Sequence, residues 1–160
     1  MDIQPIKLDI PENSNLILGQ THFIKTVEDL YEIMVGISGQ VKFGLAFCEA
    51  SGPCLIRVAG NDQSLQDSAV KNAQAIAAGH SFILLMKDAF PINFLNAIQQ
   101  CPEVCNIYCA TANPVEVIVA KTEQGAGILG VIDGFSPKGV ESPDDVKARQ
   151  SFLRQIGYKL

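Results

Sequence analysis

The residues best suited to chemistry lie in one glycine-rich stretch, EQGAGILGVIDGFSP, at residues 123–137. Gly125 and Gly127 frame a short turn, and Asp133 follows at the end of an apolar run. A nest of backbone amides can bind phosphate, and a carboxylate at the end of a strand can act as a general base. The same residues also suit a hairpin with glycines at positive φ and a turn-forming aspartate. Both alternatives stay open, although neither a helix start nor a Lys-Ser/Thr pair follows the turn, which favours the hairpin.

Three further polar residues are candidates for a site. His80, in AGHSF, precedes an apolar strand, so its imidazole is either half-buried and bonded to backbone or presented to a polar ligand. Arg57 interrupts an apolar run, and an internal Arg usually has a carboxylate or phosphate partner. Across the predicted hairpin that partner is Glu49. Asn113 precedes a proline, which is typical of a turn.

The five cysteines predict buried structural thiols and no metal site. Their odd number argues against a disulfide framework. Cys101, Cys105 and Cys109 recur every four residues, but the segment VCNIYCAT is β-branched and aromatic, which favours a strand. No CxxC pair is present, and the two histidines lie far away in the sequence.

Composition excludes several classes of partner. The chain has 160 residues, 48% of them apolar and 18% charged, with a net charge of −5. No cluster of Lys and Arg provides the basic face that nucleic acid or an anionic membrane requires. The apolar runs are too short to span a bilayer, and no signal peptide is apparent, so we expect a cytoplasmic protein. We expect one domain over residues 1–160 and, because so apolar a small domain often hides surface between copies, a homo-oligomer.

The elements that must position these residues alternate between helical and strand periodicity. Helices are predicted over residues 26–38, 63–78, 91–100 and 142–156, with Thr26 as the first N-cap and Gly39 at the left-handed position behind that helix. In VKFGLAFCEA, large apolar residues alternate with small ones, so another element should pack closely on the small face. Short strands that follow one another favour an α+β fold, a mixed and mostly antiparallel sheet packed with about four helices.

Four longer stretches, KFGLAFCEASGPCLIRVAGND, AGHSFILLMKDAFPINFLNAI, EVCNIYCATANPVEVIVAKT and GILGVIDGFSPKGVES, resemble the adenosine-specific kinase family, small proteins of archaea and some bacteria. The resemblance runs from Gly19 to the closing IGYK. It implies an α/β-type subunit that forms a trimer or a larger ring, binds adenosine or AMP and transfers a phosphoryl group to adenosine. A non-catalytic sensor or carrier of adenosine nucleotides is the alternative.

The resemblance also suggests roles for the candidate residues. Phosphoryl transfer needs a proton acceptor and groups that neutralise the phosphoryl oxygens. We assign Asp133 as the base, Arg57 or Lys121 as the phosphate contact, and the amides of Gly125–Gly127 as a cradle. Mg²⁺ would accompany ATP or another nucleotide donor. The family pattern has a basic residue between the two glycines, where this chain has Ala126, which puts the phosphate-binding role of the turn in doubt.

Adenine requires an apolar or stacking wall and a few hydrogen bonds at its edge. Phe82, Phe90 and Asn113 are assigned to supply this wall and these hydrogen bonds, with His80 near the ribose. Phe23 and Phe47 are expected in the core.

Overall fold

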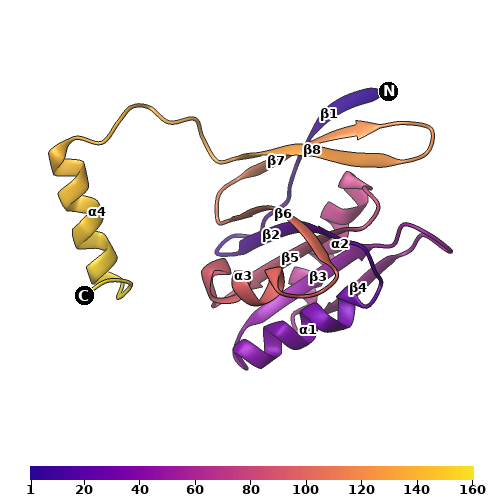
Figure 1. Cartoon of the computed structure of the whole chain (residues 1–160), viewed down its shortest axis with the longest axis horizontal. Coiled ribbons are helices and arrows are strands. Elements are labelled where there is room, and N and C mark those ends of the chain that lie inside the picture. Colours follow the sequence, from indigo (N-terminus) through magenta and orange to yellow (C-terminus); the bar gives the residue numbers. More distant parts are fainter.

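A computed structural model describes residues 1–160 as two antiparallel sheets and four helices (Figure 1). The larger sheet has the strand order β4-β3-β5-β2-β6, and the smaller one β1-β7-β8. The predicted α+β class is therefore confirmed. The larger sheet consists of β2 (Asn15–Thr21), β3 (Lys42–Cys48), β4 (Ile56–Gly60), β5 (Ser81–Lys87) and β6 (Val104–Thr111). The smaller sheet consists of β1 (Asp2–Lys7), β7 (Val115–Lys121) and β8 (Ala126–Asp133).

Two helices cover one face of the larger sheet. α1 (Thr26–Ile37) contributes Leu30 and Met34, and α3 (Pro91–Gln99) contributes Phe94 and Ile98. These side chains are buried in one cluster with the large residues of β3, namely Phe43, Leu45 and Phe47. The alternation seen in the sequence of β3 is thereby explained, because its large residues form one half of this core.

The small residues of β3 face α2 (Gln63–Ile76) on the other side of the sheet. At Gly44 the backbones of β3 and α2 lie in direct contact, since a Cβ at this position would overlap the backbone of Leu65 and Gln66. The prediction that another element packs closely here is confirmed. Asp62 caps α2 by accepting a hydrogen bond from the Leu65 amide at 3.0 Å.

The smaller sheet packs, together with α2, on this second face of the larger sheet. Val115, Val117 and Val119 of β7 are buried in the same cluster as Leu65 and Ile76 of α2. β7 and β8 form an antiparallel hairpin, in which Val115 lies opposite Asp133 and Lys121 opposite Ala126. The hairpin therefore extends across the molecule, with its turn at one end and Asp133 at the other.

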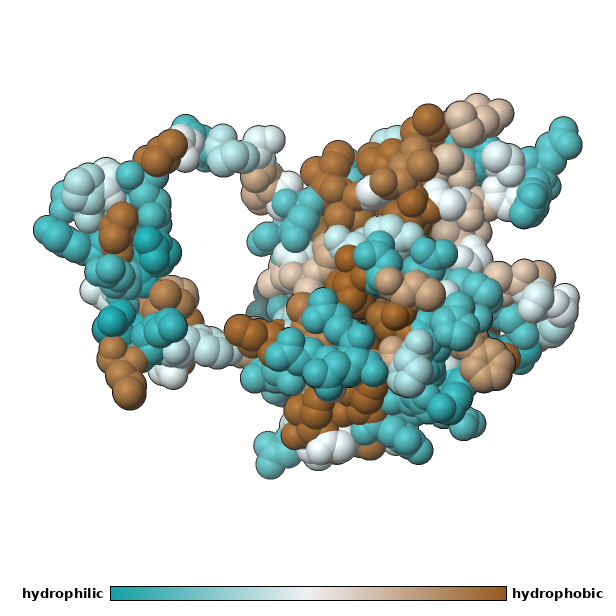
Figure 2. Space-filling view, in the orientation of Figure 1, coloured by the Kyte–Doolittle hydropathy of each residue, from teal (hydrophilic) through white to brown (hydrophobic).

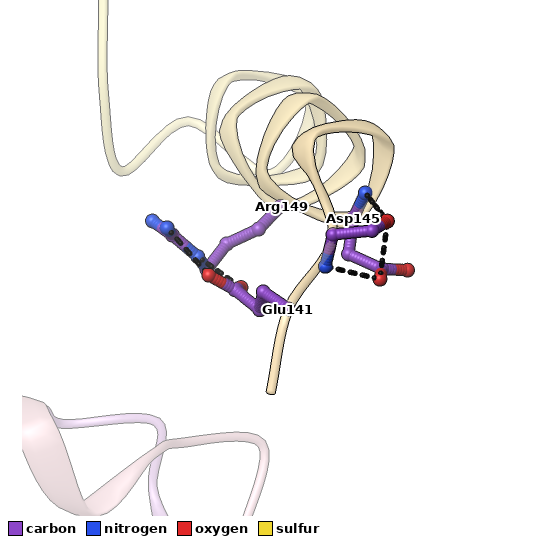
Figure 3. A network of polar contacts seen from close by, with 4 residues as sticks. Glu141, Asp145 and Arg149 are labelled. Carbon is purple, nitrogen blue, oxygen red and sulfur yellow. Dashed lines mark hydrogen bonds and ion pairs between the residues drawn. The ribbon is translucent and has the colours of Figure 1, made fainter. Parts of the chain in front are cut away.

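α4 (Pro143–Gln155) stands apart from the two sheets (Figures 1 and 2) and has no buried residue. Its start is well defined, because Ser142 and Asp145 form a capping box. Arg149 donates from Nε and Nη2 to the two carboxylate oxygens of Glu141, at 2.7 and 3.1 Å (Figure 3). These bonds join only residues of α4 and the two residues that precede it. None of the four helices combines the length and the apolar character needed to cross a membrane.

Three predicted details of the turns were wrong. Lys25, not Thr26, precedes α1, and the Thr26 hydroxyl donates instead to the carbonyl of Phe23 at 2.6 Å. Gly39, predicted in the left-handed region behind α1, is not there, whereas Ala77, the residue that follows α2, takes φ of 51°. Gly125 and Gly127 also lack positive φ, although the hairpin turn itself is confirmed.

Candidate functional site

The glycine turn opens onto a cavity of about 790 Å³. Three segments line it: the residues that follow β3, the C-terminal end of α2, and the β7–β8 turn. We call it the glycine-turn cavity; among its lining residues are Glu49, Ala50, Gln74, Ala77, Gly79, Thr122, Gln124, Gly125 and Gly127. The fold thus brings the turn against the strand end that carries Glu49.

Glycine at positions 125 and 127 leaves backbone accessible within this cavity. No atom lies within 4 Å of the place where a Cβ would stand at either residue. Neither packing nor positive φ therefore requires glycine here. Open backbone of this kind is suited to close approach by a ligand.

Glu49 and Arg57 form an ion pair at the edge of the cavity. Arg57 Nη2 donates to Glu49 Oε2 at 2.7 Å, which confirms the partner predicted across the β3–β4 hairpin. The Glu49 side chain is 14% exposed, and Arg57 Nε is buried without a hydrogen-bond partner. A buried N–H with no acceptor costs free energy, whereas the Arg57 side chain as a whole is 35% exposed and remains accessible to a ligand oxygen.

A second hollow, of about 780 Å³, adjoins the first. Ile56 lines both, and the second is also lined by Phe23, Lys25 and Arg57. Phe23 is 52% exposed, so its predicted place in the core was wrong, whereas Phe47 is fully buried. The Glu49–Arg57 pair therefore has one partner in each hollow.

His80 lies beside this region and bonds to the backbone. Its amide donates to the Cys48 carbonyl at 2.7 Å, and its carbonyl accepts from Thr21 at 2.9 Å. Its ring stacks on Phe47, with 5.9 Å between centroids and 14° between planes. Phe47 also lies opposite Arg57 in the β3–β4 ladder, so His80 and Arg57 are both neighbours of this residue. Gly79, the preceding residue, lines the glycine-turn cavity.

Asp133 and Asn113 lie together at the far end of the β7–β8 hairpin. Asp133 Oδ1 accepts hydrogen bonds from Thr111 Oγ1 at 2.7 Å and from Asn113 Nδ2 at 3.2 Å. These bonds tie the β6–β7 turn to the end of β8. The strand separates Asp133 from Gly127 by roughly 20 Å, at ~3.3 Å per residue, so within one chain they do not share a site.

The remaining candidates are divided between core and surface. Phe82 is fully buried, with its ring against Gly19, and presents no face to a ligand in this chain. Phe90 is 58% exposed and precedes α3, at the end of β5 opposite His80. Lys121 is half-buried at the end of β7 and does not line the cavity.

The fold thus groups Arg57, His80, Gly125 and Gly127 at one end of the molecule, and Asp133, Asn113 and Phe90 at the other. Glu49 is the functional candidate that the sequence analysis missed. It was predicted there only as the ion-pair partner of Arg57. The available signal was its position, a carboxylate at the end of a buried strand immediately before the turn ASGP.

Few charged side chains lie in or beside the cavity, and they limit the chemistry that it can support. Glu49 is the acidic residue among those that line it, so a Mg²⁺ ion there would depend on substrate phosphates for most of its ligands. Burial raises the pKa of the Cys48 thiol, which keeps this part of the wall neutral. The site can therefore bind a mostly uncharged molecule and offer one carboxylate and one guanidinium at its edge.

Comparison with known proteins identifies the family. A search of the curated proteins finds no match. The family model described as "Adenosine specific kinase" matches residues 6–159. Among solved structures, the PH1918 protein from Pyrococcus horikoshii OT3 is 44% identical, with a TM-score of 0.95 over 99% of this chain and 98% of that one. The resemblance seen in the sequence is confirmed, and the chain belongs to the adenosine-specific kinase family.

Proposed function

We propose that the chain binds adenosine or AMP in the glycine-turn cavity and transfers a phosphoryl group to adenosine. The observation that carries this proposal is the open backbone of Gly125 and Gly127 opposite Glu49 in one cavity, in a chain of this family. The cavity volume of about 790 Å³ lies within the range of small-molecule sites.

The walls of the cavity suit a purine nucleoside. Ile56, Ala73 and Ala77 supply apolar surface, and the amides of Gln74 and Gln124 can hydrogen-bond the edge of a base. These residues replace the aromatic wall expected from sequence, because Phe82 is enclosed in the core.

Glu49 is the group we assign as proton acceptor for the ribose 5′-hydroxyl. The 5′-oxygen forms a bond to the terminal phosphorus of the donor, the bond from that phosphorus to the donor's bridging oxygen breaks, and the hydroxyl proton passes to Glu49. Arg57 orients Glu49 through the 2.7 Å bond, and the exposed part of its guanidinium can contact a phosphoryl oxygen. Mg²⁺ and ATP, or another nucleotide donor, complete the reaction.

Asp133 remains a prediction of the sequence as general base. Because the β7–β8 hairpin separates it from the glycine turn, it can act in this cavity only from a neighbouring copy. We therefore include a homo-oligomer, a trimer as the family implies, in the proposal. The alternative base, Glu49, needs no second copy.

Binding without catalysis is the second candidate function. One observation favours it: the cationic group at the cavity edge, Arg57, is already paired with Glu49. The resemblance also implies a basic residue at the position where this chain has Ala126. Such a protein would be a sensor or carrier of adenosine nucleotides.

The test is formation of AMP and ADP from adenosine and ATP with Mg²⁺, together with calorimetric binding of adenosine. Glu49→Gln, which keeps the shape of the side chain, should lower turnover by at least about 100-fold, the usual contribution of a general base, and leave adenosine binding within a few-fold. Glu116→Gln, on the exposed face of β7, is the matched control and should match the wild type.

The outcomes separate the candidates. Adenosine binding without turnover supports the sensor or carrier. Loss of turnover in Asp133→Asn but not in Glu49→Gln moves the base to Asp133 and requires a neighbouring copy. Mixing inactive Asp133→Asn with inactive Gly127→Val chains should then restore activity in mixed oligomers. No binding of adenosine, AMP or ATP contradicts both functions.

A further inference from the structure

Three residues with metal-binding side chains meet where α1 approaches the loop between α3 and β6. Asp29 lies in the first turn of α1, Cys101 follows α3, and Glu103 immediately precedes β6. One ligand atom from each, two carboxylate oxygens and a sulfur, lies within 4.8 Å of the others. The three residues are distant from the glycine turn and have no part in the proposed reaction.

Glu103 is the unusual member of this cluster. It is 3% exposed, and its Oε1 is buried without a hydrogen-bond partner. A buried carboxylate with an unsatisfied oxygen is costly unless a proton or a cation compensates it. Asp29, the second carboxylate of the cluster, has an oxygen within 4.8 Å of a Glu103 oxygen, so two acidic side chains share this position.

The side chain of Lys25 compensates only part of this charge. Lys25 Nζ lies 3.1 Å from Asp29 Oδ2, and its side chain is 57% exposed. An ion pair at this degree of exposure contributes little to stability. The unpartnered oxygen of Glu103 therefore still needs a cation or a proton.

A hollow of about 450 Å³ gives access to the cluster. Asp29 and Cys101 line it, together with Glu32 and Gln100. An ion can enter from solvent by this route, and a water molecule or Glu32, one turn further along α1, can complete its coordination. The site therefore has buried ligands on one side and an open position on the other.

We propose that Asp29, Cys101 and Glu103 bind a divalent zinc ion. The choice of metal follows from the donor set, because Mg²⁺ and Ca²⁺ take oxygen ligands only, whereas Zn²⁺ combines thiolate and carboxylate ligands in tetrahedral geometry. Ligand atoms around tetrahedral zinc lie roughly 3.5 Å apart, so small side-chain rotations bring the three atoms around one ion.

Zinc at this position would join three separate segments. It would fix the start of α1 to the loop that connects α3 with β6, and the residues just before α1, Phe23 and Lys25, line the second hollow near Arg57. The amide of His22 already donates to the Glu103 carbonyl at 3.0 Å, which links this wall to the cluster. A bound ion would therefore stabilise one wall of that hollow.

The experiment uses the full-length chain, freed of metal with a chelator and titrated with Zn²⁺ by calorimetry. Binding of one ion per chain and a rise in melting temperature are expected. Cys101→Ser and Glu103→Gln should each weaken binding by about tenfold or more and abolish the rise in melting temperature. Co²⁺ in place of Zn²⁺ should show a thiolate-to-metal charge-transfer band in the wild type that is absent in Cys101→Ser.

Cys105→Ser is the matched control, because Cys105 is exposed and outside the cluster, and it should bind zinc as the wild type does. Melting curves without metal show whether each variant is folded. The proposal is overturned if the wild type binds no zinc, in which case a proton compensates Glu103. It is also overturned if Cys101→Ser and Glu103→Gln, both folded, bind zinc as tightly as Cys105→Ser.

Discussion

At the scale of single residues, burial divides the five cysteines into two classes. Cys54 and Cys105 are exposed, whereas Cys48, Cys101 and Cys109 are buried. Burial raises the pKa of Cys101 and of Cys109 to about 11 each, with Glu103 and Asp133 respectively as further contributors. The direction is that of a thiol removed from water and near carboxylates, both of which disfavour the thiolate.

This division predicts selective alkylation. A raised pKa keeps a thiol neutral until the pH approaches the new value, so at pH 8 roughly one in a thousand of the Cys101 and Cys109 thiols is a thiolate. In the folded, metal-free protein, iodoacetamide should modify Cys54 and Cys105 within minutes and leave the other three unmodified. Peptide mass spectrometry at successive times measures this. Equal rates at Cys101 and Cys105 would contradict the burial of Cys101, and denaturant should make all five react.

Some features of the site could be predicted from single residues in the sequence, and others could not. The ion pair of Glu49 with Arg57 could be predicted, because an Arg inside an apolar strand requires a partner and the hairpin supplied one. The separation of Asp133 from the glycine turn also follows from a strand between them, whereas the cavity that joins the turn to Glu49 could not be predicted, because its walls lie far apart in the sequence. A strand that extends ~3.3 Å per residue carries neighbours in sequence to opposite ends of a small molecule.

At the scale of elements, the contact between α2 and β3 depends on Gly44. A Cβ there would overlap the backbone of Leu65 and Gln66, which no side-chain rotation can relieve. Gly44→Ala should therefore separate α2 from the sheet and lower the free energy of unfolding by about 3 kcal/mol. Urea denaturation followed by circular dichroism measures this change.

Gly36 provides the comparison for this prediction. It lies in α1, is exposed, and no atom lies within 4 Å of a Cβ placed there. Gly36→Ala should stabilise the protein by about 0.5–1 kcal/mol, because alanine has the higher helix propensity. A Gly44→Ala variant as stable as the wild type would show that α2 shifts without cost and that its packing is not close.

The elements themselves were largely predictable, whereas their assembly was not. Alternating residues in β3 and the helical spacing of α1 come from local periodicity, which the sequence displays directly. Pairing of β1 with β7 joins residues 2–7 to residues 116–121, and no local pattern encodes such a distant partner. For the same reason the sequence predicted one sheet where the chain forms two.

At the scale of the whole molecule, two apolar surfaces have no partner in the chain. One is on α4 and the residue that follows it, where Val146, Leu153 and Ile156 recur at helical spacing and none is buried. The other is the outer face of the small sheet, where apolar side chains gather (Figure 2). Ile3, Leu129 and Ile132 are 55%, 61% and 49% exposed there. Exposed apolar faces of this extent are typical of interfaces.

These surfaces predict that α4 packs on a neighbouring copy in the proposed homo-oligomer. Residues 134–142 carry α4 away from its own sheets, and an extended segment of this length reaches about 30 Å. α4 spans roughly 20 Å, which is close to the length of the strands in the small sheet, so each copy can donate one helix and accept another. The helix then buries a face that its own chain leaves exposed.

Deletion of α4 tests this arrangement. A chain ending at Val140 keeps both sheets and the other three helices, and it should sediment as a monomer where the full chain sediments as an oligomer. Leu153→Asp should act in the same direction, because it places a charge on the apolar face of α4, whereas Lys147→Gln, on its exposed side, should leave the mass unchanged. Because the proposed interface requires a neighbour's helix, an oligomer of undiminished mass after the deletion would show that α4 does not hold the copies together, and the outer face of the small sheet would then need another partner.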